Sequence, residues 1–173
     1  MDVLMVVLRL IHVLAGVFWV GAGFHQVSFV TPAAAALGPD GQKFFQQLAF
    51  RSRFAATIMS AAVLTFLSGW YMYWKLSGFR LAWITSSYGL VLTVGAVLGT
   101  IAFIGAYQSQ YRTIGKMKTL AGKMAAAGGP PAPEMMAAMQ GHAALLTKSG
   151  QILVILLAVA VAAMATAQYL TFG

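Results

Sequence analysis

The sequence predicts an all-α fold: an integral membrane four-helix bundle with antiparallel, up-down topology. Of the 173 residues, 60% are hydrophobic and only 8% are charged. An ordinary soluble domain is about 45–50% apolar and about 25% charged. A small soluble domain also leaves much of its surface in water, so a chain this apolar needs lipid as its solvent. The length suits a single membrane domain.

Four apolar stretches are long enough to cross a bilayer, which takes about 20 residues of helix. They cover residues 3–30, 54–74, 81–107 and 151–172, and the only Lys, Arg, Asp or Glu inside them is Arg9. Because backbone groups in lipid must bond one another, each stretch is a helix or a barrel strand. Barrel strands alternate polar and apolar residues, and these stretches do not, so four helices are predicted.

The connections between the stretches set the expected topology. Residues 75–80 form a short link, which predicts an antiparallel hairpin of the second and third helices. Aromatic residues crowd around this link, as is typical of the headgroup level: Trp70, Tyr71, Tyr73, Trp74, Phe79 and Trp83. The connection at residues 112–133, low in complexity from residue 121, is expected to be mobile. Pro133 suits the first turn of a helix, which is expected to continue into the fourth stretch.

Basic residues predict the orientation. The formal net charge is +8, and eight of the eleven Lys and Arg lie in the two connections on one side of the bundle. By the positive-inside rule this side is cytoplasmic, which puts both termini outside. Four of these residues are expected to contact anionic lipid or an acidic partner subunit: Arg112, Lys116, Lys118 and Lys123. The sequence has no basic patch with interleaved aromatic residues, so a nucleic-acid partner is not expected.

Glycines predict where the helices touch, because helix association in lipid depends on close backbone approach at small residues. The first stretch contains Gly16 and Gly21, and the third contains Gly95 and Gly99 as a GxxxG pair. Packing within one bundle is the preferred interpretation of these glycines, and a dimer face is the alternative.

Missing residue types exclude several kinds of chemistry. None of the four stretches contains Asp or Glu, so a proton pump or cation transporter based on carboxylates is not expected. The chain has no Cys, which excludes disulfides, iron–sulfur clusters and thiol nucleophiles.

Histidine is the polar residue type of most interest at depth. His12 and His25 lie on the first predicted helix, about 20 Å apart along its axis. Two histidines near opposite membrane surfaces are similar to the arrangement in b-type cytochromes, where each haem takes a second ligand from another helix. The candidates for a second ligand are His142, Met164 and Met72. The same set suits copper, because thioethers favour Cu(I). The alternative is that each histidine bonds a neighbouring helix.

The first stretch also carries a family resemblance. It contains His12-Val-Leu and Trp19-Val-Gly21, which resemble the opening helix of a bacterial membrane superfamily. The superfamily includes the copper-resistance D domain, the J-type protoporphyrinogen oxidases and uncharacterised relatives. Residues 162–169 are similar to the small-residue, Met-containing close of the same group. The resemblance implies a helical bundle in a bacterial inner membrane, with His12 serving haem or porphyrin chemistry in one branch and copper handling in another. The basic residue that the oxidase branch is expected to carry on a later helix is missing from residues 81–107.

Three functions are therefore hypotheses. The leading one is a haem b or related metal centre held by His12 and His25, which would serve electron transfer or porphyrin-linked redox chemistry. The second is a non-catalytic accessory subunit of a larger membrane complex, and the third is copper transport or tolerance. The sequence leaves open whether the protein is an enzyme.

Overall fold

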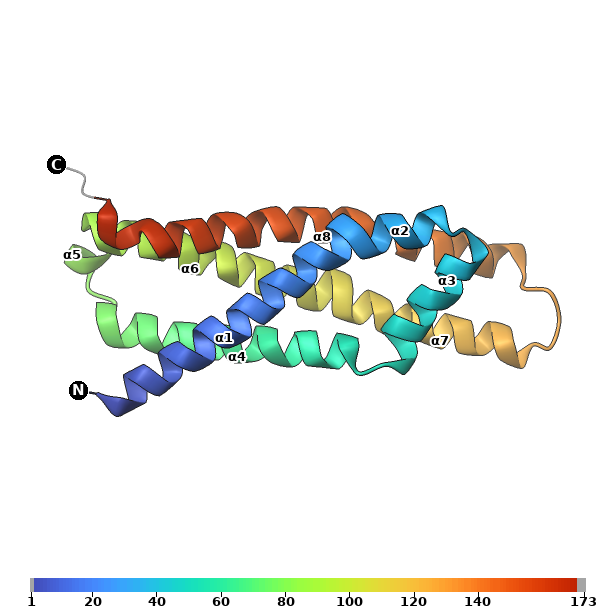
Figure 1. Ribbon diagram of the computed structural model, residues 1–173, viewed down its shortest axis with the longest axis horizontal. Coiled ribbons are helices and arrows are strands. Elements are labelled where there is room, and N and C mark those ends of the chain that lie inside the picture. The colour runs from blue at the N-terminus through green and yellow to red at the C-terminus, as the bar shows by residue number, and fades with distance from the viewer. Residues whose placement is uncertain (1, 171–173) are drawn as a thin grey trace.

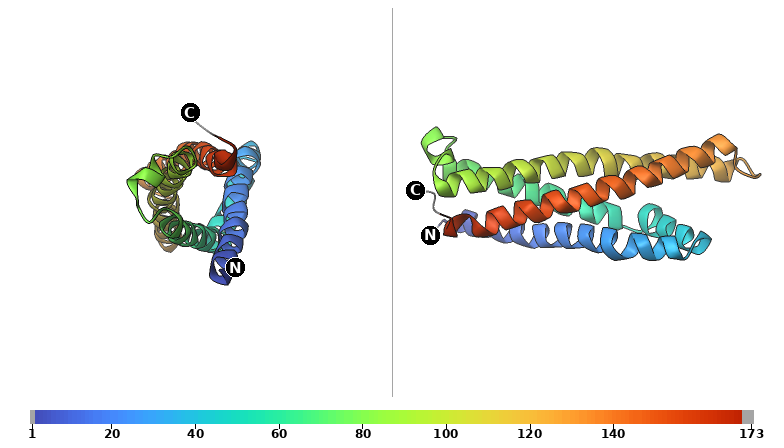
Figure 2. Two further views of the ribbon diagram at one scale, coloured as in Figure 1. Left: turned by 90° about the vertical axis from the view of Figure 1, so that its left-hand side faces the viewer. Right: turned by 90° about the horizontal axis from the view of Figure 1, so that it is seen from above.

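The computed structural model describes residues 2–170, and every regular element in that range is a helix. Four helical rods follow the long axis, with both ends of the chain at the same end of the molecule (Figure 1). Successive rods run in opposite directions in this view, and seen end-on they surround the long axis (Figure 2). The predicted all-α, four-helix fold class is confirmed. The predicted end of the fourth stretch, residue 172, lies outside the described residues.

The first rod joins α1 (Val3–His25), a π-helical turn η1 (Gln26–Val30) and α2 (Thr31–Ala36). The Asp2 side chain caps its start by accepting a hydrogen bond from the Leu4 amide at 3.1 Å. The sequence predicts an end near residue 30, before Pro32, yet the helix continues to Ala36. The π-helical turn widens the helix just before the proline, which cannot donate a backbone hydrogen bond.

The second rod is α4 (Phe54–Ser77), which begins after α3 (Pro39–Gln46) and a second π-helical turn, η2 (Gln47–Arg51). It ends at Gly78, whose left-handed φ of 52° lets the backbone leave the helix. The short link after Gly78 carries the chain into the third rod.

The third rod differs most from the prediction. A separate turn, α5 (Leu81–Ile84), comes first, and α6 (Ser87–Gly105) then starts at Ser86, whose hydroxyl accepts from the Gly89 amide at 3.1 Å. After a third π-helical turn, η3 (Ala106–Tyr111), the helix continues as α7 (Arg112–Ala126). Residues 112–126 are therefore helical, and the connection without helix is residues 127–132. Alanine, lysine and methionine are strong helix formers, and the Gly-Pro segment is what stops the helix.

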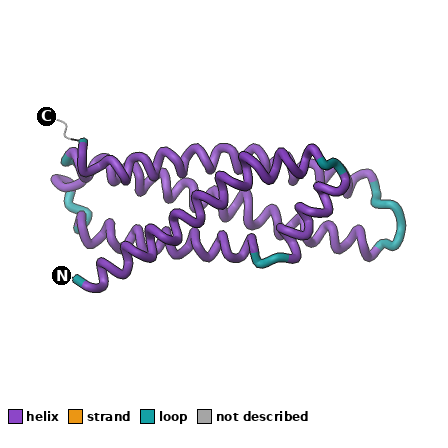
Figure 3. Tube along the Cα trace, viewed as in Figure 1, coloured by secondary structure: helices purple, strands orange, loops and turns teal. Residues whose placement is uncertain are grey.

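The fourth rod is α8 (Pro133–Thr166) followed by a 3₁₀ turn, η4 (Ala167–Tyr169). It begins at Pro133 and enters the fourth apolar stretch without a break, as the sequence predicts. Loops are confined to the ends of the rods (Figure 3).

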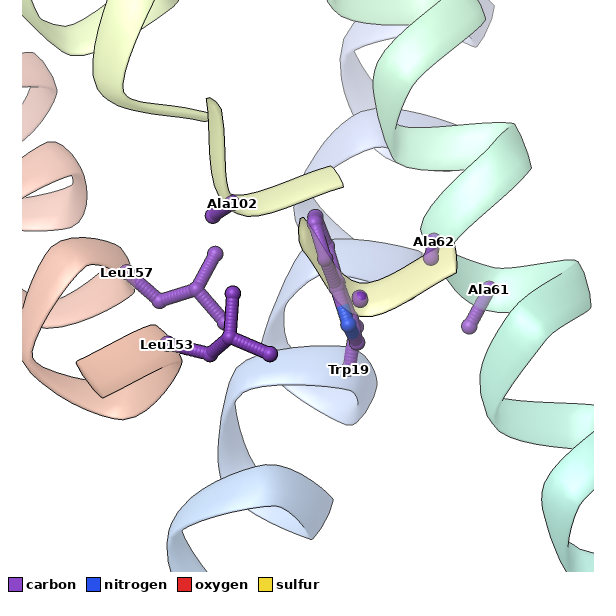
Figure 4. Packing of buried hydrophobic residues seen from close by; sticks show 7 residues of the cluster. Trp19, Ala61, Ala62, Ala102, Leu153 and Leu157 are labelled. Atoms are coloured by element: carbon purple, nitrogen blue, oxygen red, sulfur yellow. The ribbon is translucent and has the colours of Figure 1, made fainter. Parts of the chain in front are cut away.

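The core lies where Trp19 of α1 enters the bundle (Figure 4). Small residues on α4 and α6 make room for the indole: Ala61, Ala62 and Ala102. Leu153 and Leu157 of α8 complete the cluster. The indole also meets the Phe103 ring edge-on at 6.4 Å between ring centroids. One large side chain surrounded by small ones therefore brings all four rods into a single core.

Two of the four predicted contact glycines lie at close helix contacts. A Cβ added to Gly16 would lie 3.5 Å from the Thr65 methyl group, and one added to Gly95 would lie 2.8 Å from Cγ of Met164. A Cβ added to Gly21 or Gly99 would meet nothing within 4 Å among the described residues. Neighbouring helices therefore approach closely at Gly16 of the first rod and at Gly95 of the third.

Aromatic side chains join α4 to α6 at one end of the bundle. The Tyr73 hydroxyl lies 2.7 Å from the Thr93 hydroxyl, and Trp70 Nε1 donates to Thr100 at 3.0 Å. The rings of Tyr73 and Trp83 meet edge-on at 5.7 Å between ring centroids. We call this the aromatic end.

All four rods are long and apolar enough to cross a membrane, so this is a multi-pass membrane protein. The second rod has 24 residues and is about 36 Å long, close to the roughly 30 Å of a hydrocarbon core. The others have 34, 40 and 37 residues, or about 51, 60 and 55 Å. All four rods have one of their ends at the aromatic end of the molecule (Figure 1). The extra length of the three longer rods therefore extends beyond α4 at the opposite end, which holds most of the basic residues. We call it the basic end.

Candidate functional site

The first candidate site is the contact of His12 with α4. Its Nδ1 lies 2.8 Å from the Thr65 carbonyl oxygen and 3.4 Å from the Ser68 hydroxyl. A carbonyl can only accept, so Nδ1 carries a proton, and in the neutral ring Nε2 then keeps its lone pair. The ring is seated against Gly69, where an added Cβ would lie 2.7 Å from Cε1. His12 is therefore a half-buried link between two helices, and its Nε2 forms no hydrogen bond with any residue from 2 to 170.

None of the other predicted ligands forms a hydrogen bond or ring contact with His12 in the described part of the chain. His25 is exposed, with its ring 5.8 Å from that of Phe29, and His142 is half-buried near the start of α8. Met164 packs against α6 at Gly95. Met72, half-buried, is one turn beyond Ser68 on α4. Across residues 2–170, no group of three or more His, Cys, Asp or Glu is placed to hold a metal ion.

The second candidate site is a cavity of about 580 Å³ toward the basic end. Its floor is formed by Trp19, Leu153 and Leu157, which also belong to the core. Its wall extends along the projecting helices as far as Met117 of α7 and Met136 of α8. We call this space the basic-end cavity. It reaches from the core shared by the four rods toward the part of the bundle that extends beyond the start of α4.

All three π-helical turns contribute to this wall. The lining includes Gln26 and Val27 of η1, Leu48 and Ala49 of η2, and Gln110 of η3. Well under 1% of residues in ordinary proteins are π-helical, and such turns occur frequently at functional sites. Each turn inserts one extra residue and disturbs the regular packing of its helix.

The wall of the basic-end cavity is uncharged. None of the described residues that line it is Asp, Glu, Lys, Arg or His, although the basic residues gather at this end of the bundle. Its polar groups include five glutamines: Gln26, Gln42, Gln46, Gln110 and Gln140. Most of the remaining wall is aliphatic, aromatic or methionine. This lining suits a molecule that is largely apolar and carries no charge.

Gln110 is hydrogen-bonded to α8, and the turn that carries Gln26 approaches α8 at the same level. A Cβ added to Gly150 would lie 3.1 Å from Cγ2 of Val27 and 3.5 Å from Nε2 of Gln110. The turns η1 and η3 thus approach α8 at one residue, and Gln26 directly precedes Val27. Neither glutamine was predicted from the sequence as a site residue. The signal was present, because both interrupt or come directly after apolar runs of membrane length.

The predicted lipid-contact residues are all exposed on α7. They form the α7 basic set: Arg112, Lys116, Lys118 and Lys123. Within the described chain the one ion pair joins Lys43 to Asp40, so no carboxylate neutralises this set. Lys123 is about 16 Å further along the helix than Arg112.

Comparisons of the chain with known protein families, curated proteins and solved structures find no match.

Proposed function

We propose that this protein binds a small, neutral, amphipathic molecule, taken from the membrane, in the basic-end cavity. The observation that carries the proposal is an uncharged, mainly apolar space of about 580 Å³ that continues from the membrane core to the projecting helices. This volume falls in the range of about 300–1,000 Å³ that is typical of ligand pockets. A charged ligand would lose its hydration here and find no counter-charge in the wall.

The position of the cavity supports lipid as the source of the ligand. The floor at Trp19 lies within the apolar part of α1, about 9 Å before His25, and the glutamines lie further toward the basic end. An apolar body would thus lie in the direction of the core and a polar head in the direction of the projecting helices. Amphipathic molecules already have this orientation in a bilayer.

Two glycines on α1 provide the test. Gly23 lines the cavity, so Gly23→Leu would fill part of it, whereas Gly21 is exposed and an added Cβ there meets nothing within 4 Å. The purified protein would be examined by native mass spectrometry for a retained small molecule. We expect the molecule on wild type and on the Gly21→Leu control, and its loss from Gly23→Leu. Retention by Gly23→Leu, or no retained molecule on wild type, would contradict the proposal.

A metal centre at His12 is a second candidate, and one observation favours it. Histidines that bind metal commonly donate their other ring nitrogen to a backbone carbonyl, as Nδ1 of His12 does to Thr65. Haem b is the group that we propose for this position, and Nε2 of His12 is the nitrogen that would hold it. A reduced-minus-oxidised b-type spectrum that His12→Ala abolishes would support it. Stoichiometric copper without haem would instead favour copper handling, and a colourless protein that co-purifies with a large complex would favour the accessory subunit.

We also propose that the basic end faces the cytoplasm of a bacterial inner membrane, with both termini outside. The absence of native cysteine makes this simple to test. In intact cells, an impermeant maleimide should not label the Lys123→Cys variant and should label the Leu170→Cys variant. The opposite labelling pattern would reverse the orientation.

A further inference from the structure

We infer that the head of the ligand in the basic-end cavity is a hydrogen-bond donor, a hydroxyl group received by Gln26 and Gln110. This inference rests on the proposed binding function and narrows the ligand to one chemical class. The acceptors that these two glutamines leave unused point to it.

Gln110 uses both of its donors within the protein. Its Nε2 donates to the Leu146 carbonyl at 3.0 Å and to the Ser149 hydroxyl at 2.7 Å. A side-chain amide has two N–H groups, so neither remains for a ligand. Its Oε1 has no hydrogen bond to any described residue. What Gln110 can offer to the cavity is therefore an acceptor.

Gln26 likewise has an unused acceptor. Its Oε1 is shielded from solvent and has no hydrogen-bond partner in the described structure, while the side chain borders the cavity. A buried polar atom without a partner is destabilising, and proteins rarely retain one without a reason. Rotation of the flexible side chain toward a donor in the cavity would satisfy it.

Both glutamines border the same cavity, and the turns that carry them, η1 and η3, both approach α8 at Gly150. We therefore place the head group at this level. The other glutamines of the wall, Gln42, Gln46 and Gln140, are exposed and can bond water instead. A ketone, ether or ester would bring only further acceptors to this level. A hydroxyl brings the missing hydrogen. The preferred ligand is a lipid-soluble alcohol, or the dihydroxy form of a quinone-type ring rather than its oxidised form.

A matched pair of probes separates this inference from the proposed function. A long-chain isoprenoid alcohol and its methyl ether share the apolar body, and only the alcohol can donate. Their affinities would be measured by titration calorimetry in detergent, with wild type, Gln26→Met and the control Gln108→Met, whose side chain is exposed and outside the wall. We expect wild type and the control to prefer the alcohol by about tenfold, and Gln26→Met to lose most of that preference.

Each outcome has one meaning. Equal binding of alcohol and ether to wild type overturns the donor inference and leaves the cavity proposal intact. Binding of neither probe, with Gly23→Leu also without effect, overturns the cavity proposal itself. If Gln26→Met fails to fold, the comparison of the two probes on wild type still decides the question.

Discussion

Replacing Gly69 by alanine tests the closest contact between α1 and α4. The added Cβ would lie 2.7 Å from Cε1 and 3.0 Å from Nδ1 of His12. Carbon atoms pack comfortably only near 3.5 Å, so the ring must retreat by about 0.8 Å. Nδ1 starts 2.8 Å from the Thr65 carbonyl oxygen, so this retreat takes it past the useful range of about 3.2 Å. The substitution therefore removes the hydrogen bond as well as crowding the interface.

The two effects set the expected magnitude. Overpacking costs about 1–3 kcal/mol, and a lost hydrogen bond between membrane helices costs on average about 0.6 kcal/mol. The higher helix propensity of alanine offsets this loss by up to about 1 kcal/mol. We therefore expect Gly69→Ala to lower the free energy of unfolding by about 1–3 kcal/mol.

Unfolding in detergent, followed by circular dichroism, measures the effect. Gly99→Ala is the matched control, because an added Cβ there meets nothing within 4 Å, and it should be neutral or slightly stabilising. In a His12→Ala background the clash disappears, so Gly69→Ala should then cost little. Equal stability of Gly69→Ala and Gly99→Ala, or an undiminished cost in the His12→Ala background, would refute the reasoning.

Three further perturbations test other contacts. Gly95→Ala places a Cβ 2.8 Å from a methionine carbon and 3.3 Å from a backbone oxygen of α8, so it should cost about 1–3 kcal/mol in the same unfolding assay. Tyr73→Phe removes the 2.7 Å hydrogen bond to α6 and should cost about 0.6 kcal/mol, whereas a larger loss would mean that the aromatic end itself rearranges. Arg112→Gln should reduce the anionic lipid that co-purifies with the protein more than Lys123→Gln does, because charge attraction fades over about 8 Å at physiological ionic strength. Lipid retention that falls equally in both variants would show that α7 lies along the membrane surface.

The four rods were predictable because membrane crossing depends on little more than length and hydropathy. Residues 54–74, for example, carry no charge and appear as α4 almost unchanged. The helix start at Pro133 was equally predictable, because it depends only on the proline and the turn that follows it. By contrast, the helix over residues 112–126 was not predicted, because its alanine-rich, low-complexity composition is also typical of a flexible connection.

The candidate site depends on rotation of the helices about their axes, which hydropathy does not record. Each π-helical turn adds one residue and rotates the rest of its helix by about 100°. Which face Gln110 presents is therefore set by η3 itself. His12 stood out in the sequence as a polar residue within an apolar stretch, but its partner at Thr65 lies on another helix and was not predictable. His12 and His25 were expected to serve separate sites about 20 Å apart, each with a second ligand from another helix, and that prediction stays untested.

The third rod is long enough that a small tilt within the membrane would move its far end by several ångströms. Ser87–Ala126 is a single helix of 40 residues, so about half of its roughly 60 Å lies beyond a 30 Å bilayer core. A stiff arm of this kind amplifies movement: tilting it by about 10° within the membrane would sweep the far tip through about 5 Å. Changes in bilayer thickness, or in what occupies the bundle, would thus become displacements at a distant surface, where another protein could sense them without contacting the lipid.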